Sequence, residues 1–130
     1  MDNGLESFFA RYAERYMAGD AEAVAEMCET PFLAVRSGEV FHLVDTEAVV
    51  GHFAANMLAY RSAGAAAADI AAIDVLEQGT EAVLVTVHWN VRAPDASMIR
   101  DFRTSYQLVA ADPWRFLSYV NHDRVTREDS

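Results

Sequence analysis

The sequence is poor in cysteine, proline and basic residues, and each shortage excludes something. Its 130 residues include one cysteine, Cys28, so a disulfide within the chain and a zinc site built from cysteines are both excluded. No stretch approaches the roughly 18 to 20 consecutive apolar residues that a membrane span requires. Ten Lys and Arg residues face twenty Asp and Glu residues, which gives a formal charge of -10. This charge serves solubility and disfavours binding to nucleic acids or anionic membranes.

The size and the N-terminus also limit the possibilities. Acidic residues surround Leu5, where an export signal would have basic residues and a longer apolar run, so we expect no signal peptide and a cytoplasmic location. A length of 130 residues and an apolar content of 52% are typical of one globular domain. We expect residues 1–130 to form a single domain, with its core at about 5–123 and a polar tail at 124–130.

Helical patterns occupy most of the first half of the chain. Apolar residues between Leu5 and Met17 recur at helical spacing, which predicts an amphipathic helix with an aromatic buried face. Asn3 and Glu6 resemble a capping box at its start. Gly19 can adopt the positive φ that ends a helix, and Asp20 can cap the next one. This second helix must stop before Pro31. Its inward residues are expected to be Val24, Met27 and Cys28, with Cys28 a small buried apolar residue rather than a nucleophile.

Strand patterns dominate the rest. Residues 32–37 and 40–44 predict a hairpin, and Asp45 is a suitable cap for a third helix that ends at Gly64. The alanine patch at 65–68 is compatible with the end of that helix or the start of a strand. Four long strands follow, at residues 69–77, 82–92, 97–110 and 114–123, joined by short turns that favour antiparallel pairing. The order predicts an α+β fold with helices packed on one face of a mainly antiparallel sheet.

The alternation of side chains along these strands predicts polar groups on the inner face. The valines of residues 83–91 and Trp89 share one face, which we expect the helices to cover. In the last two strands the same test turns several polar residues inward, and polar groups inside a core need partners or water. We therefore predict a cavity that binds a small, partly apolar molecule. The residues predicted to line it are Tyr12, Tyr16, Arg36, Tyr60, Trp89, Arg100, Thr104, Tyr106, Ser118 and His122.

Several of these residues have a plainer interpretation. Tyr12 and Tyr16 are equally suited to be core aromatics with bonded hydroxyls, and Trp89 is suited to be a core residue. Arg100 could reach solvent from a strand end, or a β-bulge could reverse its face. His122 is the best candidate for a general base, because imidazole titrates near neutral pH. The other histidines, His42, His52 and His88, lack the spacing of metal ligands, so we predict no metal site.

The order of these elements resembles the nuclear transport factor 2-like superfamily, which includes ketosteroid isomerase, scytalone dehydratase and SnoaL-type polyketide cyclases. The resemblance covers about residues 5–123. Its carriers are RYAERYMAGDAEAVAEM (Arg11 to Met27), VVGHFAANMLAY (Val49 to Tyr60) and PWRFLSYVNHD (Pro113 to Asp123). It implies a cystatin-like, strongly curved sheet with helices wrapped into a cone, a pocket open at one end, and dimers formed through the outer face of the sheet.

The comparison with ketosteroid isomerases extends to single residues. Their oxyanion-hole tyrosine matches Tyr12. The aspartate that abstracts the proton falls near Arg36, however, and the second, protonated aspartate falls near Thr104. The isomerase mechanism is therefore not supported in this chain. SnoaL-like cyclases use polar residues of the last strands, where this chain has Ser118, His122 and Asp123.

Three hypotheses follow. The first is a small-molecule-binding protein. The second is a cofactor-free acid–base enzyme, a cyclase, isomerase or dehydratase, in which His122 moves a proton and Tyr12 or Arg100 stabilises an oxyanion. This version fails if His122 points to solvent. The third is a homodimerisation module without a ligand, and the outer face expected to form its interface contains Leu84, Ile99, Val109, Leu117 and Tyr119.

Overall fold

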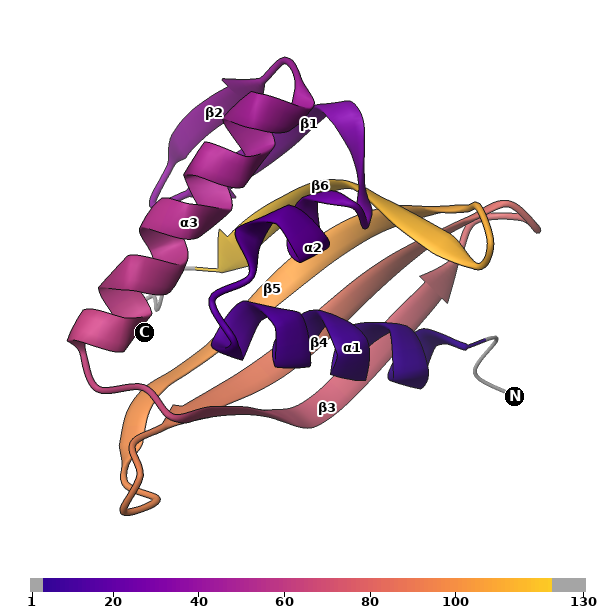
Figure 1. Cartoon of the computed structure of the whole chain (residues 1–130). Coiled ribbons are helices and arrows are strands. Elements are labelled where there is room, and N and C mark those ends of the chain that lie inside the picture. Colours follow the sequence, from indigo (N-terminus) through magenta and orange to yellow (C-terminus); the bar gives the residue numbers. More distant parts are fainter. Residues whose placement is uncertain (1–3, 123–130) are drawn as a thin grey trace.

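The fold was analysed in a computed structural model, which describes residues 4–122. Within these residues, three helices and six strands form an α+β arrangement, as predicted (Figure 1). The helices are α1 (Leu5–Met17), α2 (Ala21–Ala25) and α3 (Thr46–Ser62). The strands are β1 (Cys28–Arg36), β2 (Glu39–Leu43), β3 (Ala67–Glu77), β4 (Ala82–Arg92), β5 (Met98–Ala110) and β6 (Trp114–His122). None of the helices within residues 4–122 has the length and apolar character that crossing a membrane would require.

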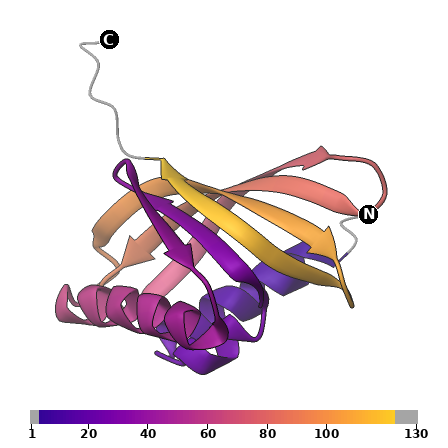
Figure 2. The ribbon, with the colours of Figure 1, turned by 90° about the horizontal axis from the view of Figure 1, so that it is seen from above.

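The six strands form one mixed sheet in the order β2-β1-β6-β5-β4-β3. Strands β3 to β6 form the predicted antiparallel meander, and β1 pairs with β2 in the predicted hairpin. Among the strands of residues 4–122, only β1 and β6 pair in parallel, and this pairing joins the N-terminal hairpin to the meander. All three helices lie on the same face of the curved sheet (Figure 2). The core therefore lies between this inner face and the helices.

The junction between the first two helices forms as the sequence predicts. Gly19 has a φ of 74°, which lets the chain leave α1, and the Asp20 carboxylate accepts a 3.0 Å hydrogen bond from the backbone N–H of Ala23. Arg15 of α1 donates to the carbonyl of Ala23 at 2.8 Å, so the two helices are also tied by a side chain. At the start of α1 the N-cap is Gly4. Asn3, expected to form a capping box, lies outside the described residues.

Two boundaries differ from the prediction. The second helix ends at Ala25, and Cys28 begins β1 instead of ending that helix. The reason is a contact distant in sequence: the Phe116 N–H donates to the Met27 carbonyl at 2.8 Å and draws this segment onto β6. The alanine patch begins a strand, because residues from Ala67 onward pair with β4. Cys28 is nevertheless buried as expected, and burial raises the pKa of its thiol to about 12.

Aromatic rings connect α1 to the sheet. The ring centroids of Tyr12 and Phe116 are 5.0 Å apart, and those of Phe9 and Tyr106 are also 5.0 Å apart. The predicted inner face of β4 is confirmed, since its alternate residues are almost completely buried: Val83, Val85, Val87, Trp89 and Val91. Burial of such side chains stabilises a fold by roughly 1.5 to 3 kcal/mol each. The sheet and α1 are thus held together mainly by apolar burial.

A β-bulge in β6 changes the predicted faces of that strand. Phe116 pairs with Leu108 and Ser118 pairs with the adjacent Gln107, so Leu117 is an extra residue on β6. The alternation reverses at this point. Tyr119, predicted to be on the outer face, is buried with 5% of its surface exposed, whereas the next residue, Val120, is 43% exposed. The inner face of β6 therefore continues through Tyr119 and Asn121.

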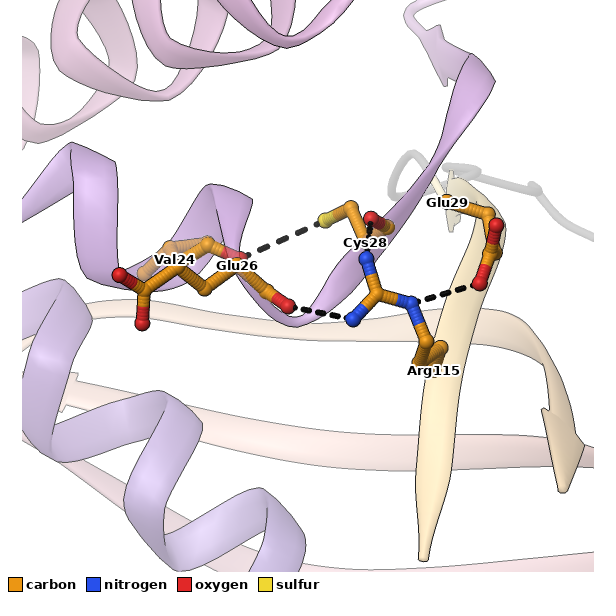
Figure 3. Close-up of polar contacts among 5 residues, drawn as sticks. All are labelled: Val24, Glu26, Cys28, Glu29 and Arg115. Carbon is orange, nitrogen blue, oxygen red and sulfur yellow. Dashed lines mark hydrogen bonds and ion pairs between the residues drawn. The ribbon is translucent and has the colours of Figure 1, made fainter. Parts of the chain in front are cut away.

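Just before the bulge, Arg115 fastens β6 to the turn between α2 and β1 (Figure 3). One guanidinium nitrogen donates to the Glu26 carbonyl at 2.8 Å, and another donates to the Cys28 carbonyl. The third lies 2.6 Å from the Glu29 carboxylate. The planar fork of arginine is suited to hold several acceptors at once, which lysine cannot do.

We expect Arg115→Ala to lower the free energy of unfolding by about 1 to 3 kcal/mol, because it removes hydrogen bonds to two carbonyls and an ion pair. Urea denaturation measures the change. Arg103→Ala, at an exposed position of β5, removes the same charge and should cost about 0.5 kcal/mol or less. Equal losses in the two variants would show that Arg115 acts only through its charge.

Candidate functional site

A cavity of about 50 Å³ lies between α1, α3 and the inner face of the sheet. It brings together seven of the ten predicted site residues: Tyr12, Tyr16, Arg36, Tyr60, Trp89, Thr104 and Tyr106. The other residues that line it are Ala13, Met17, Phe53, Asn56, Ala68, Val91, Phe102, Tyr119 and Asn121. Half of these lining residues are aromatic, and none of the described residues in the wall is acidic.

The innermost hydroxyl groups hydrogen-bond to one another. The Trp89 indole N–H donates to the Tyr106 hydroxyl at 2.9 Å, and the Tyr106 and Tyr12 hydroxyls are also hydrogen-bonded. Burial raises the pKa of both tyrosines well above the usual value. Tyr12 is therefore a neutral phenol at neutral pH, which can donate a hydrogen bond but cannot serve as a base. Its plainer interpretation as a core aromatic with a bonded hydroxyl fits these contacts.

Helix α3 contributes a polar stripe to the site. His52, Asn56 and Tyr60 are four residues apart, so they lie on one side of the helix. Asn56 accepts a hydrogen bond from Arg36 through its side-chain oxygen, and its amide nitrogen lies 3.3 Å from Nε2 of His52. Tyr60 accepts from Nη1 of Arg100 at 2.5 Å. The stripe thereby ties α3 to β1 and β5.

His52 forms a hydrogen-bonded pair with Tyr119, a residue of the cavity wall. Nε2 of His52 is 2.6 Å from the Tyr119 hydroxyl. Burial, followed by the nearby charge of Arg36, lowers the pKa of His52 below 6.5. The neutral ring accepts at Nε2, because the Asn56 amide nitrogen beside the same atom can only donate. Burial raises the pKa of the Tyr119 hydroxyl to about 12, so this hydroxyl stays protonated at neutral pH. It therefore donates the hydrogen bond that His52 accepts.

The two arginines lie at the end of the sheet where β1 and β6 finish. Arg36 is the last residue of β1, and the parallel register that pairs Val35 with Val120 brings it level with Asn121. Asn121 in turn accepts a 2.8 Å hydrogen bond from Thr104 of β5. Arg100 is on the inner face of β5 as predicted, with its guanidinium 4.0 Å from the centre of the Phe102 ring. It does not line the cavity itself but reaches it through Tyr60.

Ser118 and His122 were predicted to face the helices, and this is wrong. Because the bulge at Leu117 reverses the alternation, neither residue lines the cavity, and His122 is exposed. Nε2 of His122 is 2.8 Å from Oγ of Ser105 on the outer face of β5. The version of an acid–base enzyme that depends on His122 as a general base therefore fails.

Sequence reasoning missed four polar residues of the site: His52, Asn56, Tyr119 and Asn121. The spacing of His52, Asn56 and Tyr60 at every fourth residue was a usable signal in the sequence, since it marks one side of a helix. Nothing in the local sequence marks the bulge, so the sequence predicts Tyr119 on the wrong face and does not predict Asn121 as a site residue. Within residues 4–122, no three His, Cys, Asp or Glu side chains gather in a way that could hold a metal ion.

Comparison with known proteins supports the fold. A family model described as NTF2-like protein (DUF6841) matches residues 2–124. No curated protein matches the chain.

Solved structures with the same fold are distant in sequence. Aln2 from a Streptomyces species is 20% identical, with a TM-score of 0.71 over 91% of this chain and 86% of that one. An NTF2-like protein with a cystatin-like fold from Novosphingobium aromaticivorans is 19% identical, with a TM-score of 0.71 over 90% of this chain and 77% of that one. An NTF2-like protein of unknown function from Shewanella oneidensis is 13% identical, with a TM-score of 0.72 over 94% of this chain and 98% of that one. At these identities the likeness establishes a shared fold.

The lowered pKa of His52 predicts a loss of stability in mild acid. The unfolded chain binds a proton at the ordinary value of 6.5, whereas the folded protein resists protonation until the pH is lower. The contribution of His52 is therefore complete above 6.5 and is lost as the pH falls through the folded-state pKa. We expect the free energy of unfolding to fall between about pH 7.5 and about pH 5, and His52→Gln to flatten this dependence.

Urea unfolding at a series of pH values measures this effect. His42→Gln is the matched control, because His42 is exposed on β2 and should leave the pH dependence unchanged. A His52→Gln protein with the same dependence as the control would contradict the assignment.

Proposed function

The chain belongs to the family of NTF2-like proteins (DUF6841), and on this premise we propose that it binds a small, partly apolar molecule in the cavity between α1, α3 and the sheet. The proposal rests on one observation: an aromatic wall and several polar side chains from separate elements meet around a single space. Small-molecule sites generally combine an apolar surface with a few polar groups that fix orientation. Protein interiors are close-packed, and voids larger than a water molecule are few in each domain, so this space is consistent with a binding site.

The dimensions of the cavity restrict the ligand. A volume of about 50 Å³ accommodates a few water-sized groups, so the ligand is either small and flat or displaces side chains as it enters. Trp89 and Tyr106 offer flat apolar surfaces, but their own polar atoms are already paired with each other. Arg36, Asn56, Tyr60 and Asn121 keep further donors or acceptors beyond the hydrogen bonds described, so polar recognition is assigned to them.

Acid–base catalysis is the second candidate function, and the His52–Tyr119 pair favours it. A neutral imidazole that accepts from a hydroxyl in the cavity wall is suited to move a proton to or from a bound molecule through that hydroxyl. His52 would take the role of proton acceptor, and Tyr119 would contact the ligand. This candidate needs no cofactor. It adds a reaction to the binding proposal and does not replace it.

A cavity-filling variant tests the binding proposal. Ala68 lines the cavity from β3, and Ala68→Leu places three additional carbon atoms there. We expect wild-type protein to bind benzyl alcohol, a neutral probe, with a shift of the Trp89 indole N–H resonance in NMR spectra. Ala68→Leu should weaken this binding about tenfold or more while changing the free energy of unfolding by at most about 1 to 3 kcal/mol.

Two controls accompany this measurement. Ala72→Leu makes the same change at an exposed position of β3 and should leave binding intact. Trp114 is buried but does not line the cavity, so its indole resonance should not move. A shift of the Trp114 resonance alone, or equal binding by both leucine variants, would place the probe elsewhere and contradict the proposal.

Homodimerisation through the outer face of the sheet stays a proposal, as does the cytoplasmic location. Tyr119 does not belong to that face, but Leu33 of β1 and Val120 of β6 do. These two apolar residues lie on neighbouring strands, on the face that no helix covers, and are 37% and 43% exposed. We expect sedimentation equilibrium to give the mass of two chains, and Val120→Glu to give the mass of one. A single-chain mass for the wild-type protein at all concentrations would contradict the dimer.

A further inference from the structure

The charge of the cavity is opposite to the charge of the protein. The chain as a whole has a formal charge of -10, yet the one charged residue among those described in the wall is Arg36, and a second arginine, Arg100, reaches the wall through Tyr60. No aspartate or glutamate of residues 4–122 lines the cavity. In a chain with twice as many acidic as basic residues, this segregation concentrates positive charge at one internal position.

Both arginines have neutral partners in the structure. Arg36 donates to the side-chain oxygen of Asn56, and Arg100 donates to the Tyr60 hydroxyl at 2.5 Å. The arginine ion pairs found among residues 4–122 use other side chains, Arg92 with Asp69 and Arg115 with Glu29. A guanidinium group has five N–H donors, so each arginine retains donors beyond the bond described.

The positive charges of Arg36 and Arg100 both act on the hydroxyl group of Tyr119. Tyr119 lies on β6, between β1, which bears Arg36, and β5, which bears Arg100. Both guanidinium groups lower the pKa of Tyr119 against the stronger opposing effect of burial, and Arg36 also lowers that of His52. The wall of the cavity at Tyr119 is thus a position of positive potential inside a largely apolar space, where charges interact more strongly than in water.

We propose that the ligand is an anion, a small carboxylate with an apolar body, whose carboxylate binds between Arg36 and Arg100 beside Tyr119 and whose body packs against Trp89 and Phe102. This inference rests on the proposed binding function and specifies its ligand class. Arginine matches a carboxylate in geometry as well as charge, since two parallel N–H groups can meet the two oxygens. Asn121 and Tyr60 supply further polar contacts at the same end of the cavity.

The net negative charge of the protein opposes the approach of an anionic ligand. The two arginines must therefore attract the ligand through short-range contacts inside the cavity. A net charge of -10 repels anions in solution and slows their approach. Binding must then depend on short-range contacts with the two guanidinium groups, which screening by salt weakens less when the groups are partly buried. A neutral ligand would leave these partly buried charges without a counter-charge.

The test compares three carboxylates with their neutral amides, acetate with acetamide, butyrate with butyramide, and benzoate with benzamide. Each amide keeps the shape of its acid but lacks the charge. We expect isothermal titration calorimetry with the wild-type protein at neutral pH to show at least one acid that binds about tenfold or more tightly than its amide. Arg36→Gln and Arg100→Gln should each reduce the affinity for that acid about tenfold and change the affinity for the amide less than about twofold.

Arg103→Gln is the matched control. Arg103 is exposed on the same strand, three residues from Arg100, and its substitution removes an equal charge. It should leave both affinities unchanged. Circular dichroism and urea unfolding verify that the glutamine variants are folded. If they unfold, the wild-type preference for acid over amide still decides the question.

Different results would contradict the anionic ligand and the binding function. Equal binding of acid and amide, or loss of acid binding in Arg103→Gln as large as in the other variants, would overturn the anionic ligand and leave the binding function standing. Binding of none of the six compounds would also overturn the anionic ligand, and the experiment with benzyl alcohol then decides the binding function separately. A preference for the acid that disappears in Arg36→Gln and Arg100→Gln supports both.

Discussion

The extra residue Leu117 in β6 decides which side chains meet the helices. β6 is a central strand, paired with β1 on one side and β5 on the other, so a change in its alternation affects the whole inner face of the sheet. Because of the bulge, Tyr119 and Asn121 line the cavity and His122 lies outside it. Without the bulge the wall would present Val120 and His122, and the hydrogen bond between Tyr119 and His52 could not form.

Two kinds of interaction then share the interior. Near α1 the rings of Phe9, Tyr12, Tyr106 and Phe116 pack against one another, and their polar atoms are satisfied internally. Toward the end of the sheet the wall becomes polar, with Arg36, Asn56 and Asn121 in place of apolar residues. Burying such groups costs free energy unless they are hydrogen-bonded, and each of them has a partner. We interpret the polar region as the part of the core that serves binding at the expense of stability.

Most of the fold could be predicted from the sequence, because its signals are local. The alternation of Val83 to Val91 identifies the inner face of β4, and Gly19 with Asp20 marks the junction of the first two helices. The errors come from pairing between strands. The end of α2 and the start of β1 depend on a contact between segments about 90 residues apart, through Met27 and Phe116, and the reversal of β6 depends on the extra residue in its pairing with β5. Local propensity has no access to such contacts. His52 and Asn56, in contrast, could have been found from their helical spacing.

The central claim is that this fold encloses a binding site with positive charge at one end. A high-resolution crystal structure of the wild-type protein grown with benzoate tests it most directly. We expect electron density for the ring against Trp89 and Phe102, with the carboxylate within hydrogen-bonding distance of Arg36 and Arg100, about 2.7 to 2.9 Å. Side chains that fill the cavity, with both arginines turned to solvent and no density between them, would contradict it.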